Sequence, residues 1–262
     1  MSTTTAKAHV SAQAREGAQA PLLQVQGLTK RFAGLTAVHE VSFDVQAGSI
    51  VGLIGPNGAG KTTCFSMIAC AQRPSAGRVL FQGETLSGLA PEEVCRRGVA
   101  RTFQVVRPLL EMTVLENAMV GALLHAPRLA EAREIAAHTL ARVGLGHKLD
   151  QRAAQLTLPD RKMLELAKAL ATRPRLLLLD EVMAGLRPSE ADSIIGVLRE
   201  LHAGGLTIVL VEHVMRILMS LAQHVVVLHH GELVTQGTPQ AVTQDPRVVA
   251  SYLGQKADHA TH

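Results

Sequence analysis

Hydrophobic and polar residues alternate along the first part of this chain with the period of two that is typical of β-strands. The pattern from Leu22 onward and over residues 38–45 predicts strands that open the chain as a sheet, with a turn at residues 47–48. Residues 49–54 form another strand-length apolar run, and residues 61–71 contain neither Gly nor Pro and suit a helix. This part of the chain is therefore predicted to run strand, loop, helix.

Helical spacing dominates the middle of the chain, where Ala, Leu, Glu and Arg replace the alternating pattern. Residues 113–124 and 129–143 carry clear helical periods, and the block around them, about residues 105–165, is predicted to be an inserted helical subdomain. Strand-length runs then return, separated by helix-like stretches such as residues 189–202. These runs are residues 176–180, 207–212 and 225–228. Strands that alternate with helices predict an α/β fold with a mainly parallel sheet.

The composition indicates a globular protein that does not bind nucleic acid. Hydrophobic residues make up 47% of the 262 residues, which is ample for a core, while aromatic residues make up 2% and offer few rings for stacking on bases. The net charge of +4 would suit an acidic partner, but Lys and Arg are scattered apart from pairs such as Arg96-Arg97 and Arg161-Lys162. A solvated basic face is therefore the preferred interpretation of these pairs.

Neither a membrane span nor a secretion signal is predicted. The longest apolar runs have strand length, well short of the roughly 18 residues that a membrane helix needs. Residues 1–21 lack the apolar core of a signal peptide and are predicted to be a flexible tail, as are residues 255–262. The cysteines, Cys64, Cys70 and Cys95, lack metal-ligand spacing, which suits a reducing cytosol and predicts small buried side chains. The protein is accordingly expected in the cytoplasm.

A phosphate-binding motif follows the strand predicted at residues 49–54. The sequence matches G-x-x-x-x-G-K-[ST] between a strand and a helix, which is the context that the motif requires and which argues against an ordinary glycine turn. In this motif backbone N–H groups surround the β-phosphate, the lysine reaches the β- and γ-phosphates, and the first threonine ligates Mg²⁺. The residues predicted to bind the nucleotide here are Gly55, Pro56, Asn57, Gly58, Ala59, Gly60, Lys61, Thr62 and Thr63.

An apolar run at residues 176–179 ends in two carboxylates, Asp180 and Glu181. This is the form of a Walker B strand, in which Asp180 would join Thr62 in holding Mg²⁺ and Glu181 would act as the general base on the attacking water. The alternative is an acidic pair that simply faces solvent at the end of a strand. The phosphate-binding motif favours the catalytic interpretation because the two motifs belong to one site.

With these motifs in place, the chain resembles the ABC ATPase family over residues 22–254. The resemblance implies a P-loop NTPase core with an antiparallel β subdomain and an inserted helical subdomain. It implies that Gln104 senses Mg²⁺ and water, and that His213 closes a strand against the γ-phosphate. Phe32 is similar to the aromatic residue that stacks on adenine, although a plain core residue at the end of a strand is an equal interpretation.

Further segments are similar to the branched-chain amino-acid importer branch of this family. They are residues 101–104, 112–117, 231–237, 245–246 and 252–254. The resemblance implies an ATPase that uses ATP and Mg²⁺ at the cytoplasmic face of the inner membrane, as a peripheral subunit. Its implied partners are a second ABC ATPase subunit, membrane permeases and, indirectly, a solute-binding protein, with no nucleic acid. Alternatives are an exporter or lipid-extraction cassette, a non-transport ABC ATPase, and a cassette that binds ATP without hydrolysing it.

The family signature Leu-Ser-Gly-Gly-Gln is altered in this chain, where residues 156–160 read Leu-Thr-Leu-Pro-Asp before a helix predicted to begin near Arg161. Pro159 lacks an N–H, and Asp160 places a negative charge near phosphate unless a basic neighbour compensates it. A structural role in starting the helix is also available to both residues. Since the family's signature acts on the partner's nucleotide, the resemblance implies a heterodimer with one weaker site, with a homodimer as the alternative. Val182 and Arg187 also depart from the usual pattern, without an assigned effect.

Overall fold

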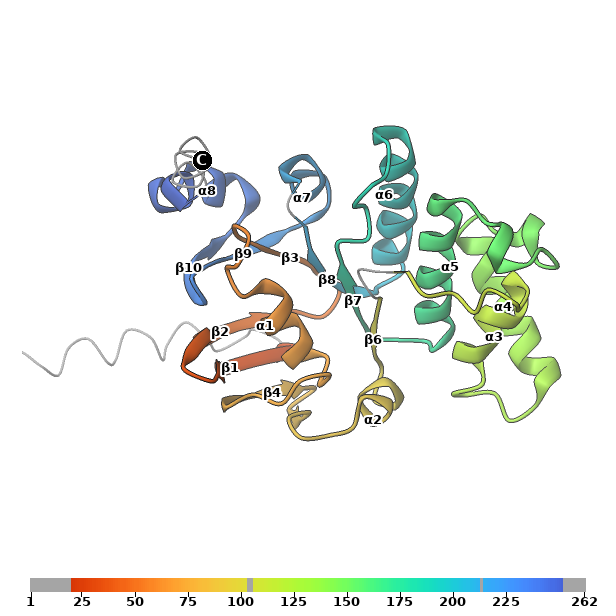
Figure 1. The fold of residues 1–262 in the computed structure, drawn as a ribbon, viewed down its shortest axis with the longest axis horizontal. Coiled ribbons are helices and arrows are strands. Elements are labelled where there is room, and N and C mark those ends of the chain that lie inside the picture. Colours follow the sequence, from red (N-terminus) through yellow and green to blue (C-terminus); the bar gives the residue numbers. More distant parts are fainter. Residues whose placement is uncertain (1–19, 103–105, 213, 252–262) are drawn as a thin grey trace, which may run out of the picture.

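The computed structural model describes residues 20–102, 106–212 and 214–251, which fold into two β-sheets and a set of covering helices (Figure 1). The strands are β1 (Leu23–Phe32), β2 (Leu35–Val45), β3 (Ile50–Ile54), β4 (Ala76–Phe81), β5 (Glu84–Thr85), β6 (Val99–Arg101), β7 (Leu176–Asp180), β8 (Thr207–Val211), β9 (His224–His229) and β10 (Glu232–Gly237). The helices are α1 (Lys61–Ile68), α2 (Pro91–Arg96), α3 (Val114–Ala122), α4 (Leu129–Arg142), α5 (Leu158–Ala171), α6 (Pro188–Ala203), α7 (Met215–Leu221) and α8 (Pro239–Gln244). Short 3-10 helices include η2 (Gly146–Lys148) and η3 (Ala153–Gln155).

The strands divide by direction into an antiparallel and a mainly parallel sheet. The antiparallel sheet has the order β2-β1-β4-β5, and the larger sheet has the order β10-β9-β3-β8-β7-β6, with β10 alone running antiparallel to its neighbour. Because β3 pairs with β8 and β8 with β7 in parallel, the carboxyl ends of these strands meet at one edge. The α/β fold with an antiparallel sheet beside a parallel one is the predicted class.

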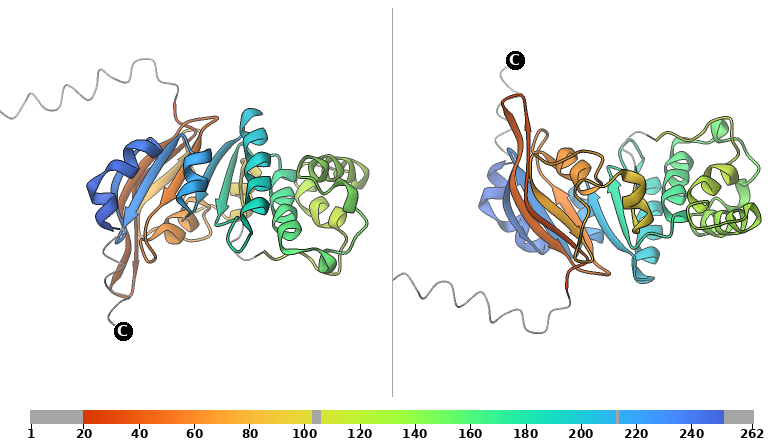
Figure 2. Two further views of the ribbon diagram at one scale, coloured as in Figure 1. Left: turned by 90° about the horizontal axis from the view of Figure 1, so that it is seen from above. Right: turned by 90° about the horizontal axis from the view of Figure 1, so that it is seen from below.

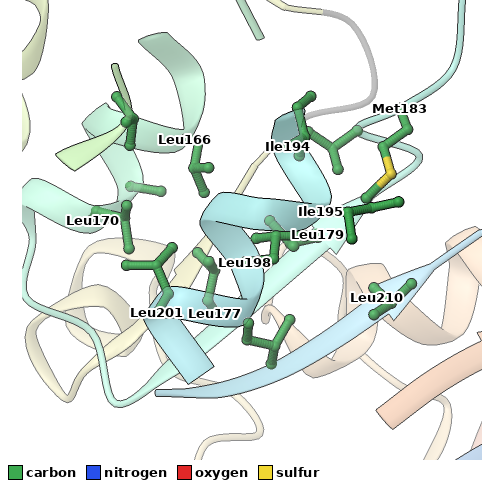
Figure 3. Packing of buried hydrophobic residues seen from close by; sticks show 14 of the residues in the cluster. Leu166, Leu170, Leu177, Leu179, Met183, Ile194, Ile195, Leu198, Leu201 and Leu210 are labelled. Atoms are coloured by element: carbon green, nitrogen blue, oxygen red, sulfur yellow. The ribbon is translucent and has the colours of Figure 1, made fainter. Parts of the chain in front are cut away.

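Both faces of β7 are buried, which explains its continuous apolar sequence. Leu177 and Leu179 pack in one hydrophobic cluster, and Leu176 and Leu178 pack in another on the opposite face. Figure 3 shows the first cluster, in which α6 lies over the strand and contributes a row of side chains at helical spacing. That row comprises Ile194, Ile195, Leu198 and Leu201. Each fully buried side chain of this size contributes about 1.5–3 kcal/mol to the free energy of unfolding.

Helices α3, α4 and α5 form a helical block at the far end of the molecule from the antiparallel sheet (Figures 1 and 2). The division of the chain into an inserted helical subdomain at about residues 105–165 stays a prediction, and α5 continues to Ala171. The first helix of this block begins at Val114 with a capping box. Thr113 Oγ1 accepts a hydrogen bond from Glu116 N at 3.1 Å, and Glu116 Oε2 accepts one from Thr113 N at 2.7 Å. These bonds satisfy N–H groups that the helix itself leaves open, so the start of α3 is determined locally.

Several sequence predictions differ from the structure. The helix predicted over residues 61–71 ends at Ile68, because Cys70 has a left-handed backbone with φ of 53°. Cys64 is buried as expected, and burial raises the pKa of its thiol to about 12, but Cys70 and Cys95 are only half-buried. Among the described residues, none of the helices combines the length and apolar character that crossing a membrane requires.

The prediction of a solvated basic pair at Arg161-Lys162 is wrong for Lys162, whose exposed fraction is 4%. Helix α5 begins at Leu158, one turn earlier than predicted, and its buried face includes Lys162, Glu165, Leu166 and Ala169. These positions have the spacing i, i+3, i+4 and i+7, which places the lysine on the face that packs inward.

Candidate nucleotide-binding site

The loop between β3 and α1 has a backbone that only glycine can adopt at two of its positions. Gly55 has φ of 152°, and a Cβ there would lie 2.1 Å from the carbonyl oxygen of Leu228. Gly60 has φ of 91°, and a Cβ there would lie 2.4 Å from the carbonyl oxygen of Ala37. The glycines of the motif therefore let the loop pass close to its neighbours and turn into α1.

Helix α1 starts with its N-terminal N–H groups open to a ligand. Its N-cap is Gly60, which has no side chain to bond them, and its first turn contains no acidic residue. Such an N-terminus combines free N–H donors with the positive end of the helix dipole, which together favour a phosphate. Thr62 and Thr63 lie in this first turn, where their hydroxyls border the same space.

Lys61 is held within the loop that precedes it. Its exposed fraction is 7%, and its Nζ donates hydrogen bonds to the carbonyl oxygens of Gly55 at 2.7 Å and Pro56 at 2.9 Å. Burial lowers the pKa of Lys61, while the charges of Glu181 and Asp180 act in the opposite direction. A buried ammonium group that faces two carboxylates is well placed to bind an anion that carries its own metal ion.

A cavity of about 510 Å³ opens over this loop. It is lined by residues 57–63 of the loop and α1, by Glu181 from the end of β7, and by His230 from the turn between β9 and β10. The start of β2 completes it with Leu35, Thr36 and Ala37. Leu35 and His230 carry no motif, so sequence reasoning missed them, and only the closeness of their turns to the loop reveals them.

Phe32 does not line this cavity. It ends β1 opposite Leu35, has an exposed fraction of 41%, and its ring lies 5.1 Å from Lys30 Nζ. The interpretation of Phe32 as a buried core residue is wrong, since the ring is on the surface. Its assignment as the residue that stacks on adenine remains a prediction.

Asp180 ends β7 as a buried carboxylate with an exposed fraction of 1%. Its Oδ2 accepts a hydrogen bond from Arg101 Nη2 at 2.8 Å in an ion pair, while its Oδ1 is buried with no hydrogen-bond partner among the described residues. Arg101 also donates to Ser66 Oγ in α1 at 3.2 Å. One oxygen is therefore neutralised by arginine, and the other is available to a further ligand.

The described residues contain no group of three or more His, Cys, Asp and Glu that could hold a metal ion by themselves. Mg²⁺ sites in nucleotide-binding proteins need no such group, because substrate phosphates and water supply most of the ligands. The buried Oδ1 of Asp180 and the hydroxyl of Thr62 are the protein oxygens that fit such an ion.

Glu181 adopts a left-handed backbone with φ of 47°, which is uncommon outside glycine. Its N–H donates to the carbonyl oxygen of Val211 at 3.0 Å, and its carbonyl oxygen accepts from Ala184 N at 3.1 Å. These bonds hold the turn after β7, so that the Glu181 side chain borders the cavity over the phosphate loop. Strain of this kind is found where a side chain must be aimed at a site.

Gln104 and His213 lie outside the described residues, so their predicted roles stay predictions. The described chain stops at Thr102 before the first of these gaps and at Glu212 before the second. Thr102 follows β6 and Glu212 follows β8, next to β7 at the edge that carries Asp180. Glu212 is 1% exposed, and its Oε1 accepts a hydrogen bond from Met183 N at 3.3 Å.

Lys162 of α5 is a buried cation near this edge that sequence reasoning missed. Burial lowers its pKa, while the charges of Glu212 and Glu181 act to raise it. The lysine therefore lies within electrostatic range of both carboxylates, and it helps to compensate negative charge beside the cavity.

The altered signature forms the N-terminus of α5. Thr157 is its N-cap, with Oγ1 accepting from Asp160 N at 3.4 Å and donating to Asp160 Oδ2 at 2.7 Å. Lys148 Nζ lies 2.6 Å from the same Oδ2, and Pro159 lies in the first turn. Burial acts to raise the pKa of Asp160, but the bonds from Lys148 and Thr157 outweigh it and leave the pKa below its usual range. This helix end therefore already carries its own carboxylate and a compensating cation.

The other two departures from the expected pattern have local structural roles. Val182 is buried in the core beside α6. Arg187 precedes α6, and its Nε donates to Glu190 Oε1 at 2.8 Å in the first turn of that helix. Neither residue is among the described residues that line the cavity over the phosphate loop.

Comparisons with known proteins agree with this geometry. The family model described as ABC transporter matches residues 38–184, more than half of the chain. High-affinity branched-chain amino acid transport ATP-binding protein BraF of Pseudomonas aeruginosa is 39% identical over 251 residues, covering 90% of this chain and 98% of the relative. The similarly named protein LivG of Escherichia coli is 39% identical over 253 residues, with the same coverage.

Solved structures are similar over the same length. An ATP-binding cassette of an ABC transporter in its ADP conformation has a TM-score of 0.82 and 31% identity, and covers 90% of this chain and 100% of that one. A nucleotide-free cassette from an ABC transporter has a TM-score of 0.81 and 30% identity, with coverage of 89% and 99%.

Proposed function

The chain belongs to the ABC transporter family of ATP-binding proteins, and we propose that it drives uptake of branched-chain amino acids or related small polar solutes. It is an ATPase of this family. The observation that supports the substrate class is the match, over nearly the whole length of both chains, to transport ATP-binding proteins whose names specify branched-chain amino acids. In this proposal the solute crosses the membrane through separate permeases. This chain, as a peripheral ATPase on the cytoplasmic face, supplies the energy.

ATP would bind with its phosphates on the N-terminus of α1, where Lys61 would exchange the loop carbonyls for phosphate oxygens. Mg²⁺ would be held by Thr62 and by Asp180 Oδ1, with Gln104 as a further ligand, and it would neutralise charge on the β- and γ-phosphates. Glu181 would accept a proton from the attacking water, and His213 would contact the γ-phosphate. The bond from Arg101 to Asp180 Oδ2 supports this arrangement because it fixes the orientation of the carboxylate.

A groove on the helical side offers a place for the permease. It has a volume of about 290 Å³ and lies between α2, α3 and α5, with a mainly apolar lining that includes Val94, Cys95 and Val120. Arg101 lines the same groove and also binds Asp180. A permease helix in this groove would therefore contact Arg101, which is bonded to the proposed metal ligand Asp180. Movement of the permease could then change the nucleotide site through this ion pair.

The partner cassette is proposed to be a different chain. In a dimer of this family the signature of each chain would face the other chain's nucleotide, and here that surface carries Asp160 where an incoming phosphate would approach. The phosphate loop of this chain has no acidic residue in the corresponding first turn of α1. A heterodimer would pair this loop with an intact signature, while the opposite site, which uses Asp160 and Pro159, would turn over more slowly.

Reconstitution would test the transport proposal. The chain, its second cassette, the permeases and the binding protein would be placed in proteoliposomes, and uptake of labelled leucine and valine would be followed with ATP. We expect uptake that requires ATP and that stops when Glu181→Gln is introduced in this chain. Export of solute, or ATP hydrolysis that responds to lipid but not to the binding protein, would contradict an importer.

A further inference from the structure

A second cavity, of about 760 Å³, opens at the amino ends of β7 and β8. Its walls come from α4, from the segment between α5 and β7, and from the turn between α6 and β8. The phosphate loop and Asp180 lie at the carboxyl ends of their strands, so the two cavities open at opposite edges of the parallel sheet, and they share no lining residue. Small-molecule sites in proteins have volumes of about 300–1,000 Å³, a range that includes this one.

Positive charge exceeds negative charge in the lining of this cavity. Arg142, Arg173 and Arg175 line it, and none of their guanidinium groups has a hydrogen bond or ion pair to another described residue. Glu134 is the one carboxylate among the described residues of the lining, which also include His138. Six other arginines of the described chain do have acidic partners. These are Arg97, Arg101, Arg152, Arg187, Arg216 and Arg247.

Arg173 stands in a backbone conformation that favours glycine. It follows the C-cap of α5 with φ of 50°, the left-handed position that commonly ends a helix and that Gly or Asn usually occupies. An arginine is less favourable there because of its Cβ. The turn alone therefore does not account for an arginine, and Arg173 is one of the residues that line the cavity.

The rest of the lining is apolar. Ile135, Leu170, Leu201 and Leu206 contribute to it, together with Leu22 at the start of the described chain. The segment that precedes Leu22 does not complement this cavity in charge, since residues 1–19 contain two basic residues, Lys7 and Arg15, against one acidic residue, Glu16. Apolar walls beside three unpaired guanidinium groups suit a ligand that has both an apolar body and a negative charge.

We propose that this cavity binds a small organic anion. Its carboxylate or phosphate group would be held by Arg142, Arg173 and Arg175, and its compact apolar body would pack on Ile135 and Leu206. Because Arg142 and Ile135 belong to α4 while the other residues border the sheet, the ligand would tie the helical block to the core. The site is separate from the nucleotide site, so it does not depend on how ATP is used.

Calorimetric titration of the full chain with three probes tests this proposal. The probes are hexanoate, which has both features, inorganic phosphate, which has only the charge, and 1-hexanol, which has only the apolar body. We expect saturable binding of hexanoate at one site, and binding at least about tenfold weaker for the other two probes. Absence of hexanoate binding up to about 20 mM overturns the proposal. Binding of phosphate as tight as that of hexanoate overturns the part of it that concerns the apolar walls.

Variants locate the binding. The triple variant Arg142→Gln, Arg173→Gln and Arg175→Gln should weaken hexanoate by about tenfold or more, since charge-assisted bonds are lost. A control triple variant should bind hexanoate as tightly as the parent does. It makes the same change in charge outside the cavity, with Arg73→Gln, Arg96→Gln and Arg133→Gln. Glu134→Gln removes the one carboxylate and should tighten binding by about twofold. ATP affinity, measured in each preparation, shows that the variants are folded, and hexanoate binding that survives the triple change contradicts the proposal.

Discussion

The N-termini of α1 and α5 both expose backbone N–H groups that the helix itself does not bond. They differ in whether nearby side chains bond those groups. Helix α1 follows a glycine, has no acidic residue in its first turn, and leaves its N–H groups to a ligand. Helix α5 follows Thr157 and contains Asp160 in its first turn, bonded to Thr157 and to Lys148. Because both helices have the positive end of a dipole there, the side chains alone decide which end can receive phosphate.

In the proposed dimer, this difference would make the two surfaces of one chain unequal. The α1 surface would supply the charge and the donors for a nucleotide, while the charge of Asp160 on the α5 surface is already paired with Lys148. A phosphate that approached α5 would have to compete with Thr157 for the N–H of Asp160, and with the Asp160 carboxylate for Lys148.

The largest effect is expected at Lys61. Lys61→Ala removes a buried ammonium group at the phosphate loop, and we expect ATP affinity to fall by about a hundredfold, as measured by equilibrium binding. Lys148→Ala is the matched control at α5, and it should leave the affinity of the chain's own loop unchanged. Equal losses of ATP affinity in the two variants would contradict the proposed difference between the N-termini of α1 and α5.

Gly60→Ala should damage the α1 end through the backbone. A Cβ at Gly60 would lie 2.4 Å from the Ala37 carbonyl oxygen at φ of 91°, so we expect the free energy of unfolding in urea to fall by about 2–3 kcal/mol. Gly58→Ala is the control, since its φ of 78° is similar but nothing lies within 4 Å of the new Cβ. It should cost about 1 kcal/mol, and a cost equal to that of Gly60→Ala would show that the close contact is unimportant.

The α5 end can be altered toward the family signature. The double variant Pro159→Gly and Asp160→Gln does this: the first substitution restores a backbone N–H, and the second removes a negative charge. We expect hydrolysis at the site opposite this surface to rise by about three- to tenfold, measured as steady-state ATPase of the assembled dimer. Asp150→Gln, a nearby change of the same charge on an exposed residue, should have no effect. Unchanged hydrolysis in the double variant would mean that these residues do not limit turnover.

The smallest effect concerns pH and stability. The pKa of Asp160 in the folded chain lies below its ordinary value of 3.8, so its charge contributes stability that is present above pH 3.8 and is lost as pH falls below it. Asp160→Asn should therefore lower the free energy of unfolding at pH 7 by about 0.5–1 kcal/mol, because the pair with Lys148 is partly exposed. The difference from the parent should shrink on acidification below pH 3.8, and a constant difference would contradict the role of the charge.

Local patterns in the sequence predict the strand, glycine loop and helix of residues 50–68 and the strand that ends at Asp180, and the structure has these elements. Residues 176–180 were predicted as a strand and form β7, because a continuous apolar run flanked by helices has few other uses in an α/β fold. The predicted start of α5 lies one turn too late. Thr157, which belongs to the altered signature, is also the residue that caps the helix.

Contacts between distant segments could not be predicted in the same way. Lys148 reaches Asp160 only because η2 folds back against the start of α5, and nothing in the local sequence indicates this approach. Arg101 and Asp180 are likewise joined by the pairing of β6 with β7. Leu35 and His230 border the nucleotide cavity through turns that carry no motif. Such contacts depend on the packing of whole elements, which one sequence does not specify by spacing.

Single-turnover hydrolysis in the assembled pair of cassettes tests whether the two surfaces of this chain are unequal. One dimer carries Glu181→Gln in this chain, and the other carries the equivalent substitution in the partner. We expect Glu181→Gln to remove most of the rapid phosphate release, because it disables the site that pairs this phosphate loop with the partner's signature. The substitution in the partner should leave most of the release intact. Equal losses from the two substitutions would contradict the claim that the two surfaces of this chain are unequal.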